Sequence, residues 1–274
     1  MRQIITELTD LRYLEWTRTR HSSGTAGSFL KAYEQKRGVK YYYKLSSYDG
    51  VHGITGHECV NEIIADRLLT LLEIPHLSYQ LIHALISVRG REMETWLCCS
   101  RDFKQPGDSK IALDAFYDLE AGPSESPLDF CVRMGFETYI SQMLLIDFLI
   151  LNRDRHGANI EILKNRKTRS YRPAPLFDHG LSLLFSCRSE AEYLQTDPRE
   201  DKRVQSFIGS ASTRDNLSLI PGEHRRPLPP LDAAAMAFLF EDITDIMGPV
   251  WCEAIRHFLE VRWKLYEDFC DQKS

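Results

Sequence analysis

The sequence has few features of a disulfide-bonded or zinc-binding protein. It contains seven cysteines among 274 residues, and no two of them are spaced as C-x-x-C. An odd number of cysteines in a chain of this size does not indicate a disulfide framework, and no Cys/His cluster has the spacing of a metal site. We therefore expect a protein of a reducing compartment.

Long apolar runs are also absent. The longest, residues 143–151, is short and contains Asp147, and acidic residues lie near the N-terminus where a signal peptide would have its apolar core. We expect no membrane insertion and a cytoplasmic location, while export by a route without a cleaved signal stays open.

The chain has no excess of basic residues. Its net charge is −5 and its pI is about 6.0, which argues against a generic nucleic-acid-binding protein. No direct contact with nucleic acid is predicted. The basic segment 164–169 is typical of a solvated turn, with docking of an acidic partner as the alternative. A Gly-Lys-Ser/Thr ending is missing from the glycine-rich segment near residue 25, which disfavours a P-loop NTPase.

Three side chains that handle protons or metal ions stand out in residues 148–178. Asp154 lies five positions before Asn159, and Asp178 follows nineteen positions later. The catalytic loop of protein kinases has a base Asp five positions before a metal-binding Asn, followed by a second metal-binding Asp. A lone Asp-x4-Asn is usually a structural turn. The combination with its surroundings favours a phosphotransfer site.

Those surroundings predict a helix, a loop and a hairpin. The apolar run 139–151 predicts a buried helix, which ends at the polar loop 152–159. Residues 159–163 alternate like a strand, and 174–177 lead back to Asp178. In an antiparallel hairpin, Asn159 and Asp178 would lie at the same end and share one Mg²⁺, with Asp154 within reach.

The N-terminal part predicts a five-stranded sheet with one main helix. Strands are expected at 13–20, 29–33, 39–45, 77–88 and 93–99, and residues 56–73 have one apolar helical stripe.

This part also supplies candidate nucleotide contacts. Lys44 lies near a strand end and would pair with a carboxylate of the helix, either Glu58 or Glu62. The loop with Gly24 and Gly27 allows backbone amides to approach phosphates, although such loops are commonly flexible turns. The backbone from Leu97 to Cys99 would form the linker between lobes and contact an adenine.

The second part of the chain is expected to be mainly helical. Helices are predicted at 110–119, 128–134, 137–151, 231–247 and 249–270, with a long irregular connection at 186–230. The fold class is therefore α+β with two lobes, a β-rich N-lobe at 1–99 and a helical C-lobe at 100–274.

The residues resemble those of HipA-like serine/threonine kinases, bacterial relatives of the protein kinase and phosphatidylinositol kinase folds. The run 152–159, NRDRHGAN, is similar to the N-x-D-R-H-x-x-N catalytic loop of that family, and 175–178, PLFD, is similar to its metal-binding segment. The resemblance implies Asp154 as the base and Asn159 with Asp178 as Mg²⁺ ligands. Lys44, supported by Glu62, would contact ATP.

The sequence also departs from that family. The toxin kinases carry an additional N-terminal subdomain that has no counterpart before Tyr13, so a complex with antitoxin and operator DNA of the usual kind is not expected. Counterparts of an autophosphorylated serine in the glycine loop would be Ser22, Ser23 or Ser28. His179 stands where many protein kinases have Phe.

The leading hypothesis is an ATP- and Mg²⁺-dependent kinase that acts on Ser or Thr of a protein substrate, with autophosphorylation and an antitoxin or regulatory protein as further expectations. A lipid or small-molecule kinase of the same fold is one alternative. A nucleotide-binding pseudokinase scaffold is another. The physiological acceptor stays open.

Overall fold

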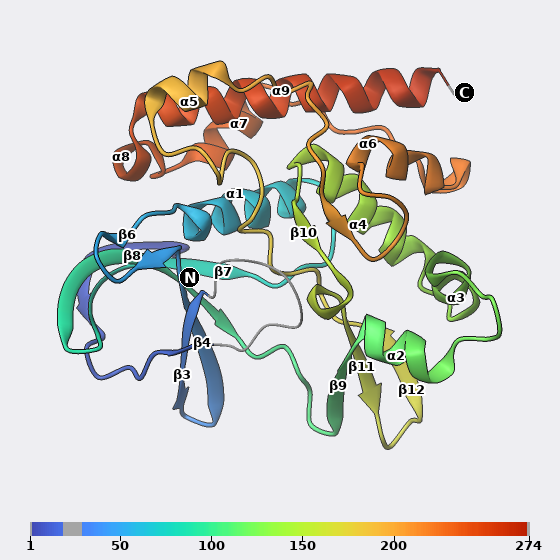
Figure 1. The fold of residues 1–274 in the computed structure, drawn as a ribbon, viewed down its shortest axis with the longest axis horizontal. Helices are drawn as coiled ribbons and strands as arrows, with labels where there is room; N and C mark the ends of the chain where they lie inside the picture. Colours follow the sequence, from blue (N-terminus) through green and yellow to red (C-terminus); the bar gives the residue numbers. More distant parts are fainter. Residues whose placement is uncertain (1, 19–28, 273–274) are drawn as a thin grey trace.

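A six-stranded sheet forms the N-terminal part of the computed structural model, which describes residues 2–18 and 29–272 (Figure 1). Its strand order is β1-β7-β8-β4-β3-β2, and only β1 and β7 run parallel. The strands are β1 Ile4–Asp10, β2 Thr17–Arg18, β3 Leu30–Lys36, β4 Val39–Leu45, β7 Tyr79–Val88 and β8 Arg91–Arg101. A small hairpin of β5 Tyr48–Asp49 and β6 Gly53–Ile54 follows β4.

The first strand was not expected from the sequence. The prediction of a strand over 13–20 is wrong for most of its described part, where only Thr17–Arg18 pairs with β3. The first strand is instead β1, at the sheet edge beside β7. Only Ile4 of β1 is buried, so the strand has no alternating apolar pattern by which it could be recognised.

The predicted linker through Leu97 and Cys99 is also wrong. These residues lie inside β8, where Leu97 pairs with both Leu45 and Ile82. Strands on both sides of β8 use its main-chain groups, so they are not free for an adenine. The connection to the second part of the chain begins after Arg101, two residues beyond the predicted lobe boundary.

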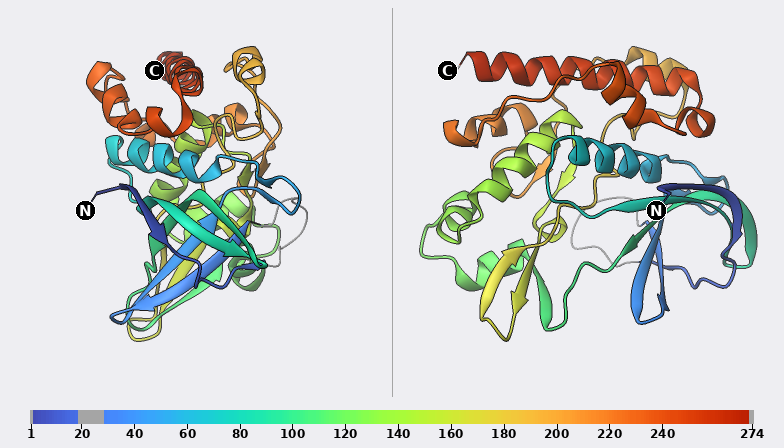
Figure 2. Two further views of the ribbon diagram at one scale, coloured as in Figure 1. Left: turned by 90° about the vertical axis from the view of Figure 1, so that its left-hand side faces the viewer. Right: turned by 180° about the vertical axis from the view of Figure 1, so that it is seen from behind.

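Helix α1, Glu58–Leu71, lies between the sheet and the helices of the second lobe (Figures 1 and 2). Every residue from Glu58 to Leu69 is buried, because β7 and β8 cover one side and helix α7, Ala233–Phe240, covers another. The buried surface of this helix is therefore wider than the single apolar stripe predicted from the sequence. The helix ends before Glu73, whose φ is 51°, and Pro75 follows.

The second lobe begins with a strand rather than the expected helix. Residues 108–112 form β9, which pairs with the hairpin of strands β11 and β12 in the order β12-β11-β9. The helix predicted at 110–119 starts only at Leu113. The elements are β9 Asp108–Ala112, α2 Leu113–Glu120, α3 Pro127–Arg133, α4 Glu137–Leu149, β10 Asp154–Arg155, β11 Glu161–Asn165 and β12 Ser170–Pro173.

The last ninety or so residues close the lobe around α9, Pro249–Asp271, which lies along its outer face (Figure 2). The predicted helix 231–247 is split into α7 and α8 at Asp242, whose φ is 59°. The connection at 186–230 is mostly irregular and holds short elements. These elements are α5 Glu190–Gln195, β13 Gln205–Ser206 and α6 Thr213–Asn216, with 3₁₀ turns at Leu217–Leu219 and Gly222–His224. The helices α7 Ala233–Phe240 and α8 Thr244–Met247 follow the connection, and a further 3₁₀ turn lies at Gly157–Asn159.

Two apolar clusters lie on opposite faces of the six-stranded sheet. The smaller one, which includes Tyr43, Leu45 and Leu97, covers the face away from α1. The larger one runs from α1 through α4 to α9 without interruption. The two lobes therefore share one core on the α1 side. Within the described residues no helix is long and apolar enough to cross a membrane.

A buried ion pair crosses the core of the second lobe. Arg155 donates from Nε to Asp147 Oδ2 at 2.9 Å and from Nη2 to Asp147 Oδ1 at 3.0 Å. Its Nη1 donates to the main-chain oxygens of Asn159, at 3.2 Å, and Phe177, at 2.9 Å. One guanidinium thus joins the end of α4 to both segments that carry the predicted site.

Replacement of Arg155 by Met is expected to lower the free energy of unfolding by about 3–5 kcal/mol, because Asp147 would be left as a buried, unpaired charge. Urea unfolding followed by circular dichroism measures this loss. Arg12→Met, which removes exposed pairs with Asp10 and Glu92, is the matched control and should change stability little. Equal effects of the two substitutions would contradict the structural role given to Arg155.

His57 joins the start of α1 to the closing helices. Its ring makes edge contacts with Trp251 and Tyr193, with centroid distances of 5.4 and 6.3 Å. Burial lowers the pKa of His57 to about 4, and its Nε2 has no hydrogen-bond partner among the described residues. The folded protein therefore holds this imidazole in its neutral form.

Because the pKa of His57 is lower in the folded than in the unfolded chain, the unfolded chain binds this proton more tightly. The free energy of unfolding is therefore unaffected by protonation of His57 above about pH 6.5 and decreases as the pH falls towards 4. The loss amounts to at most about 3 kcal/mol. His57→Phe keeps an aromatic ring and removes the titration. The urea midpoint should fall less between pH 7 and pH 4.5 in this variant than in the wild type. An equal fall in both proteins would overturn the assignment.

Candidate active site

The catalytic loop predicted at 152–159 is held in shape by side chains of the loop itself. Asn152 donates from Nδ2 to Asp147 Oδ1 at 2.9 Å, and its Oδ1 accepts a hydrogen bond from the backbone N–H of Asp154 at 3.2 Å. The short strand β10, Asp154–Arg155, pairs in parallel with β13, Gln205–Ser206. The loop is thus anchored both to α4 and to the irregular connection.

Asp154 is half-buried in the loop, with one carboxylate oxygen unused among the described residues. Its Oδ1 is buried and has no hydrogen-bond partner among the described residues, while His156 Nε2 lies 3.6 Å from it. Burial raises the pKa of Asp154 above its ordinary value; the charge of His156 opposes this shift and that of Asp178 adds to it. An orphaned oxygen on a carboxylate of raised basicity suits a group that accepts a proton.

The backbone segments around Asn159 and Asp178 lie close to each other. The hairpin of β11 and β12 extends to a bond from Ala174 N–H to Glu161 O, and Arg155 binds the main chain beside both site residues. Asn159 donates from Nδ2 to the main-chain oxygen of Asp154 at 2.8 Å. No described residue donates to Asn159 Oδ1, so this oxygen is free to bind a cation.

Asp178 has an unusual backbone and a strongly stabilised negative charge. Its φ is 61°, a conformation that non-glycine residues seldom adopt outside constrained sites. Burial alone would raise the pKa of Asp178, but the charges of Lys44 and Lys31 and the hydrogen bond from Lys44 hold it well below its usual range. The carboxylate is therefore ionised at neutral pH.

Lys44 connects the two lobes through two carboxylates. Its Nζ lies 3.0 Å from Glu62 Oε1 and also forms an ion pair with Asp178. The Lys44 side chain is 11% exposed and that of Glu62 is fully buried. The open choice between two glutamates is thus decided for Glu62, because Glu58 accepts a hydrogen bond from the backbone N–H of Ser47 at 3.0 Å instead.

A second lysine, which the sequence did not point to, faces the same side of the sheet. Lys31 on β3 is paired directly with Lys44 on β4, and directly paired residues of antiparallel strands share a face. Its charge also acts on the carboxylate of Asp178. Two lysines of the sheet therefore face Asp178. Only the register of the sheet reveals Lys31.

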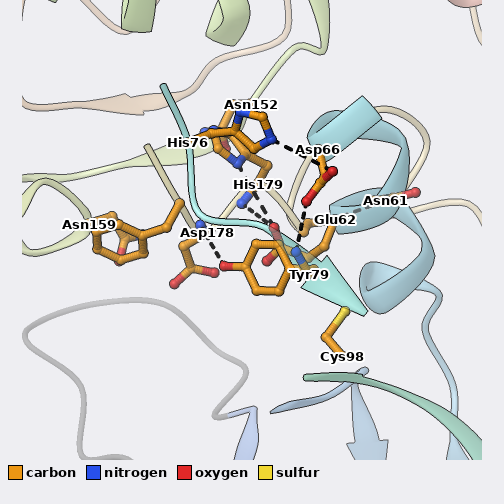
Figure 3. Close-up of polar contacts among 12 residues, drawn as sticks. Asn61, Glu62, Asp66, His76, Tyr79, Cys98, Asn152, Asn159, Asp178 and His179 are labelled. Atoms are coloured by element: carbon orange, nitrogen blue, oxygen red, sulfur yellow. Dashed lines mark hydrogen bonds and ion pairs between the residues drawn. The ribbon is translucent and has the colours of Figure 1, made fainter. Parts of the chain in front are cut away.

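Polar contacts hold the segment after the hairpin against α1 and β7 (Figure 3). The backbone N–H of His179 donates to Glu62 Oε2 at 2.8 Å, and that of Asp178 lies 3.4 Å from Tyr79 Oη. Tyr79 in turn donates its backbone N–H to Asp66 Oδ2 at 2.7 Å. Tyr79 and Asp66 were not identified from the sequence, since nothing in their local pattern distinguishes them from ordinary strand and helix residues.

Gly180 allows this segment to approach α1 closely. A Cβ at this position would lie 3.1 Å from Glu58 Cβ and 3.3 Å from Glu62 Oε1. Asn61 fixes the approach by donating from Nδ2 to the main-chain oxygens of Gly180, at 3.0 Å, and Ser182, at 2.9 Å. The position of Glu62 beside Lys44 therefore depends on a glycine in the other lobe.

The donors gathered here fit a hard divalent cation. Asp178 offers an ionised carboxylate and Asn159 a free amide oxygen, and Mg²⁺ prefers such oxygen ligands with water completing its shell. The described residues contain no group of three or more His, Cys, Asp or Glu side chains that could hold a metal. A cation at this place would thus be bound by two side chains and by substrate phosphates, as in phosphotransfer enzymes.

Not every predicted contact belongs to this site. Gly24 and Gly27, together with Ser22, Ser23 and Ser28, lie outside the described residues. Leu97 and Cys99 are in the interior of the sheet. In place of that linker, Phe103 packs near Phe177, with ring centroids 6.1 Å apart. The described site therefore consists of Lys44, Glu62, Asp154, Asn159 and Asp178.

Comparisons with known proteins give structural rather than sequence matches. No family model and no curated protein sequence matches the chain. The structure is similar to a Helicobacter pylori proinflammatory kinase, CtkA, with a TM-score of 0.69 and 14% identity, over 97% of this chain and 98% of the other.

A second match is HipA of Shewanella oneidensis MR-1, solved with HipB and operator DNA. Here the TM-score is 0.49 and the identity 16%, over 91% of this chain and 66% of the other. The expected fold class is confirmed: the chain has the two-lobed α+β fold of the Helicobacter pylori kinase, with a β-rich N-terminal lobe and a mainly helical C-terminal lobe.

Proposed function

We propose that the protein is an ATP- and Mg²⁺-dependent kinase that transfers the γ-phosphate of ATP to a Ser or Thr hydroxyl of a protein. The observation that carries the proposal is the junction of Lys44, Glu62 and Asp178 beside Asp154 and Asn159. These five side chains come from both lobes and from segments far apart in the sequence. The kinase-like fold adds support to a phosphotransfer reaction in general.

Each side chain has a distinct task in this reaction. Asp154 Oδ1 accepts the proton of the acceptor hydroxyl as its oxygen attacks the γ-phosphorus and ADP leaves. Asn159 and Asp178 would hold Mg²⁺, which neutralises phosphate charge when bound. Lys44 and Lys31 attract phosphate oxygens, and Glu62 positions Lys44. Catalysis then rests on alignment and charge compensation.

The segment after Asp178 is held differently from that of many protein kinases, in which packing of a Phe controls its position. His179 stands at the position of their Phe, and its side chain is buried with Nε2 unpartnered among the described residues. Its backbone N–H is bound by the same Glu62 that holds Lys44. The segment after Asp178 is therefore fixed through its main chain.

Two other functions use the same geometry. A lipid or small-molecule kinase would need the same five side chains, and label transfer to a phosphoinositide but never to protein would favour it. A pseudokinase scaffold would bind nucleotide without turnover. The orphaned Asp154 Oδ1 favours a working base over a scaffold. An antitoxin partner has no support in the described site and stays an expectation.

Replacement of Asp154 by Ala is expected to slow phosphate transfer by about 10²- to 10⁴-fold, the usual cost of losing a general base. Purified protein incubated with labelled ATP and Mg²⁺ and analysed by intact mass tests this, with casein as a generic acceptor. Asp118→Asn, an exposed change on α2, is the matched control and should behave as the wild type. Unchanged transfer by the Asp154 variant would refute the assignment.

Replacement of Asp178 by Ala is expected to remove the Mg²⁺-dependent part of ATP binding while the chain stays folded. A ligand present at about 100 times its Kd stabilises by about 2.7 kcal/mol, which for a chain of this size raises Tm by several degrees. Thermal unfolding with ATP, with and without Mg²⁺, measures the difference. A Mg²⁺-dependent shift as large as that of the wild type or Asp118→Asn would count against Asp178 as a ligand.

A further inference from the structure

A cavity of about 760 Å³ opens beside the catalytic loop, on the side of β13. Arg153, His156 and Gly157 of the loop form one wall, and the chain from Arg203 to Phe207 forms another. β13 pairs with β10 on one edge, and no strand pairs with its other edge within the described part of the chain. On that edge the N–H of Val204 donates to Ala211 O at 2.9 Å, which leaves the main-chain groups of Ser206 open. The cavity therefore combines space for side chains with a short strand edge for main-chain hydrogen bonds.

Two guanidinium groups give this cavity its charge. Arg153 donates from Nε to the main-chain oxygen of Arg203 at 2.8 Å, which fixes its side chain and leaves both Nη groups without a partner among the described residues. The side chain of Arg203 is exposed and makes no hydrogen bond or ion pair with any described residue. Two arginines with unused donors therefore line the cavity, one from each wall.

The acidic groups nearby do not cancel this charge. Asp114 lines the cavity and keeps its negative charge, but among the described residues it forms no ion pair with Arg153 or Arg203, and one of its oxygens accepts a hydrogen bond from the backbone N–H of Ala115 at 2.7 Å. Glu200 acts on Arg153 at longer range but is itself paired with Lys202 at 3.7 Å. The cavity thus retains unmatched donors of the kind that bind carboxylates in pairs.

The cavity also lies next to the proposed base. His156 belongs to its lining, and His156 Nε2 is 3.6 Å from Asp154 Oδ1. One side chain therefore separates the cavity from the oxygen that would accept the proton of the acceptor hydroxyl. Successive residues of an extended peptide are about 3.3 Å apart, so residues next to the acceptor would reach the cavity.

We propose that this cavity selects the acceptor: an extended peptide segment binds along β13, and an Asp or Glu close to the acceptor Ser or Thr pairs with Arg203 and Arg153. The inference rests on the proposed kinase function and names its substrate class. Arg203 acts in recognition only. The exposed position of its side chain makes it replaceable without loss of the fold.

Binding of two labelled peptides tests the proposal. Fluorescence anisotropy is measured with the full chain and fluorescein-labelled Gly-Gly-Glu-Ala-Glu-Gly-Gly, in which Ala replaces the acceptor, and with the same peptide carrying Gln for Glu. The Glu peptide should bind about tenfold more tightly than the Gln peptide at low salt, as expected for one bidentate arginine contact. Arg203→Gln should remove this preference.

Arg199→Gln is the matched control, because Arg199 lies on the same connection, is exposed and is absent from the cavity lining. It should keep the preference. Equal binding of the two peptides by the wild type, a preference retained in Arg203→Gln, or no binding of either peptide up to about 1 mM would each overturn the proposal.

A parallel transfer assay separates this inference from the proposed function. The same peptides with Ser in place of Ala are incubated with labelled ATP and Mg²⁺. Transfer to both peptides at equal rates would remove the inference and leave the kinase function standing. A Glu preference in binding without transfer to any acceptor would remove the kinase function and leave a peptide-binding surface.

Discussion

The active-site geometry depends on the buried guanidinium of Arg155. It donates four hydrogen bonds, two to the carboxylate of Asp147 and two to the main-chain oxygens of Asn159 and Phe177. A buried arginine stays charged, and the cost of removing it from water is offset only where such partners surround it, so the helix end, the loop 152–159 and the hairpin must meet at this point. The positions of the proposed base, Asp154, and of the two metal-binding candidates follow from this packing.

A second constraint links the two lobes. Lys44 comes from the sheet, Glu62 from α1 and Asp178 from the second lobe, and all three meet in a site with little exposure to solvent. The apolar core on the α1 side continues into the second lobe, so α1 cannot shift without disturbing both. Ion pairing and core packing therefore favour the same arrangement of Glu62 and Lys44.

Much of the site could be predicted because its key residues are close in the sequence. A helix followed by a loop and a hairpin returns Asp178 to the neighbourhood of Asn159, whatever the rest of the chain does. The predicted linker failed for the opposite reason. Leu97 and Cys99 are apolar in either setting, and only the pairing of β8 with β4 and β7 makes them interior. Strand β1 was missed because its exposed residues leave no apolar alternation.

The sequence by itself determined the order and spacing of Asp154, Asn159 and Asp178, the helices that precede and follow them, and the α+β class. These depend on local hydrophobic period and turn chemistry, which act over a few residues. Tertiary structure alone decided that Glu62 and not Glu58 binds Lys44, that Lys31 faces the site, and that Arg203 lies beside the catalytic loop. Contacts of this kind join segments far apart in the sequence, as Lys44 and Asp178 do over 134 residues, and their free energy depends on packing that no local pattern specifies.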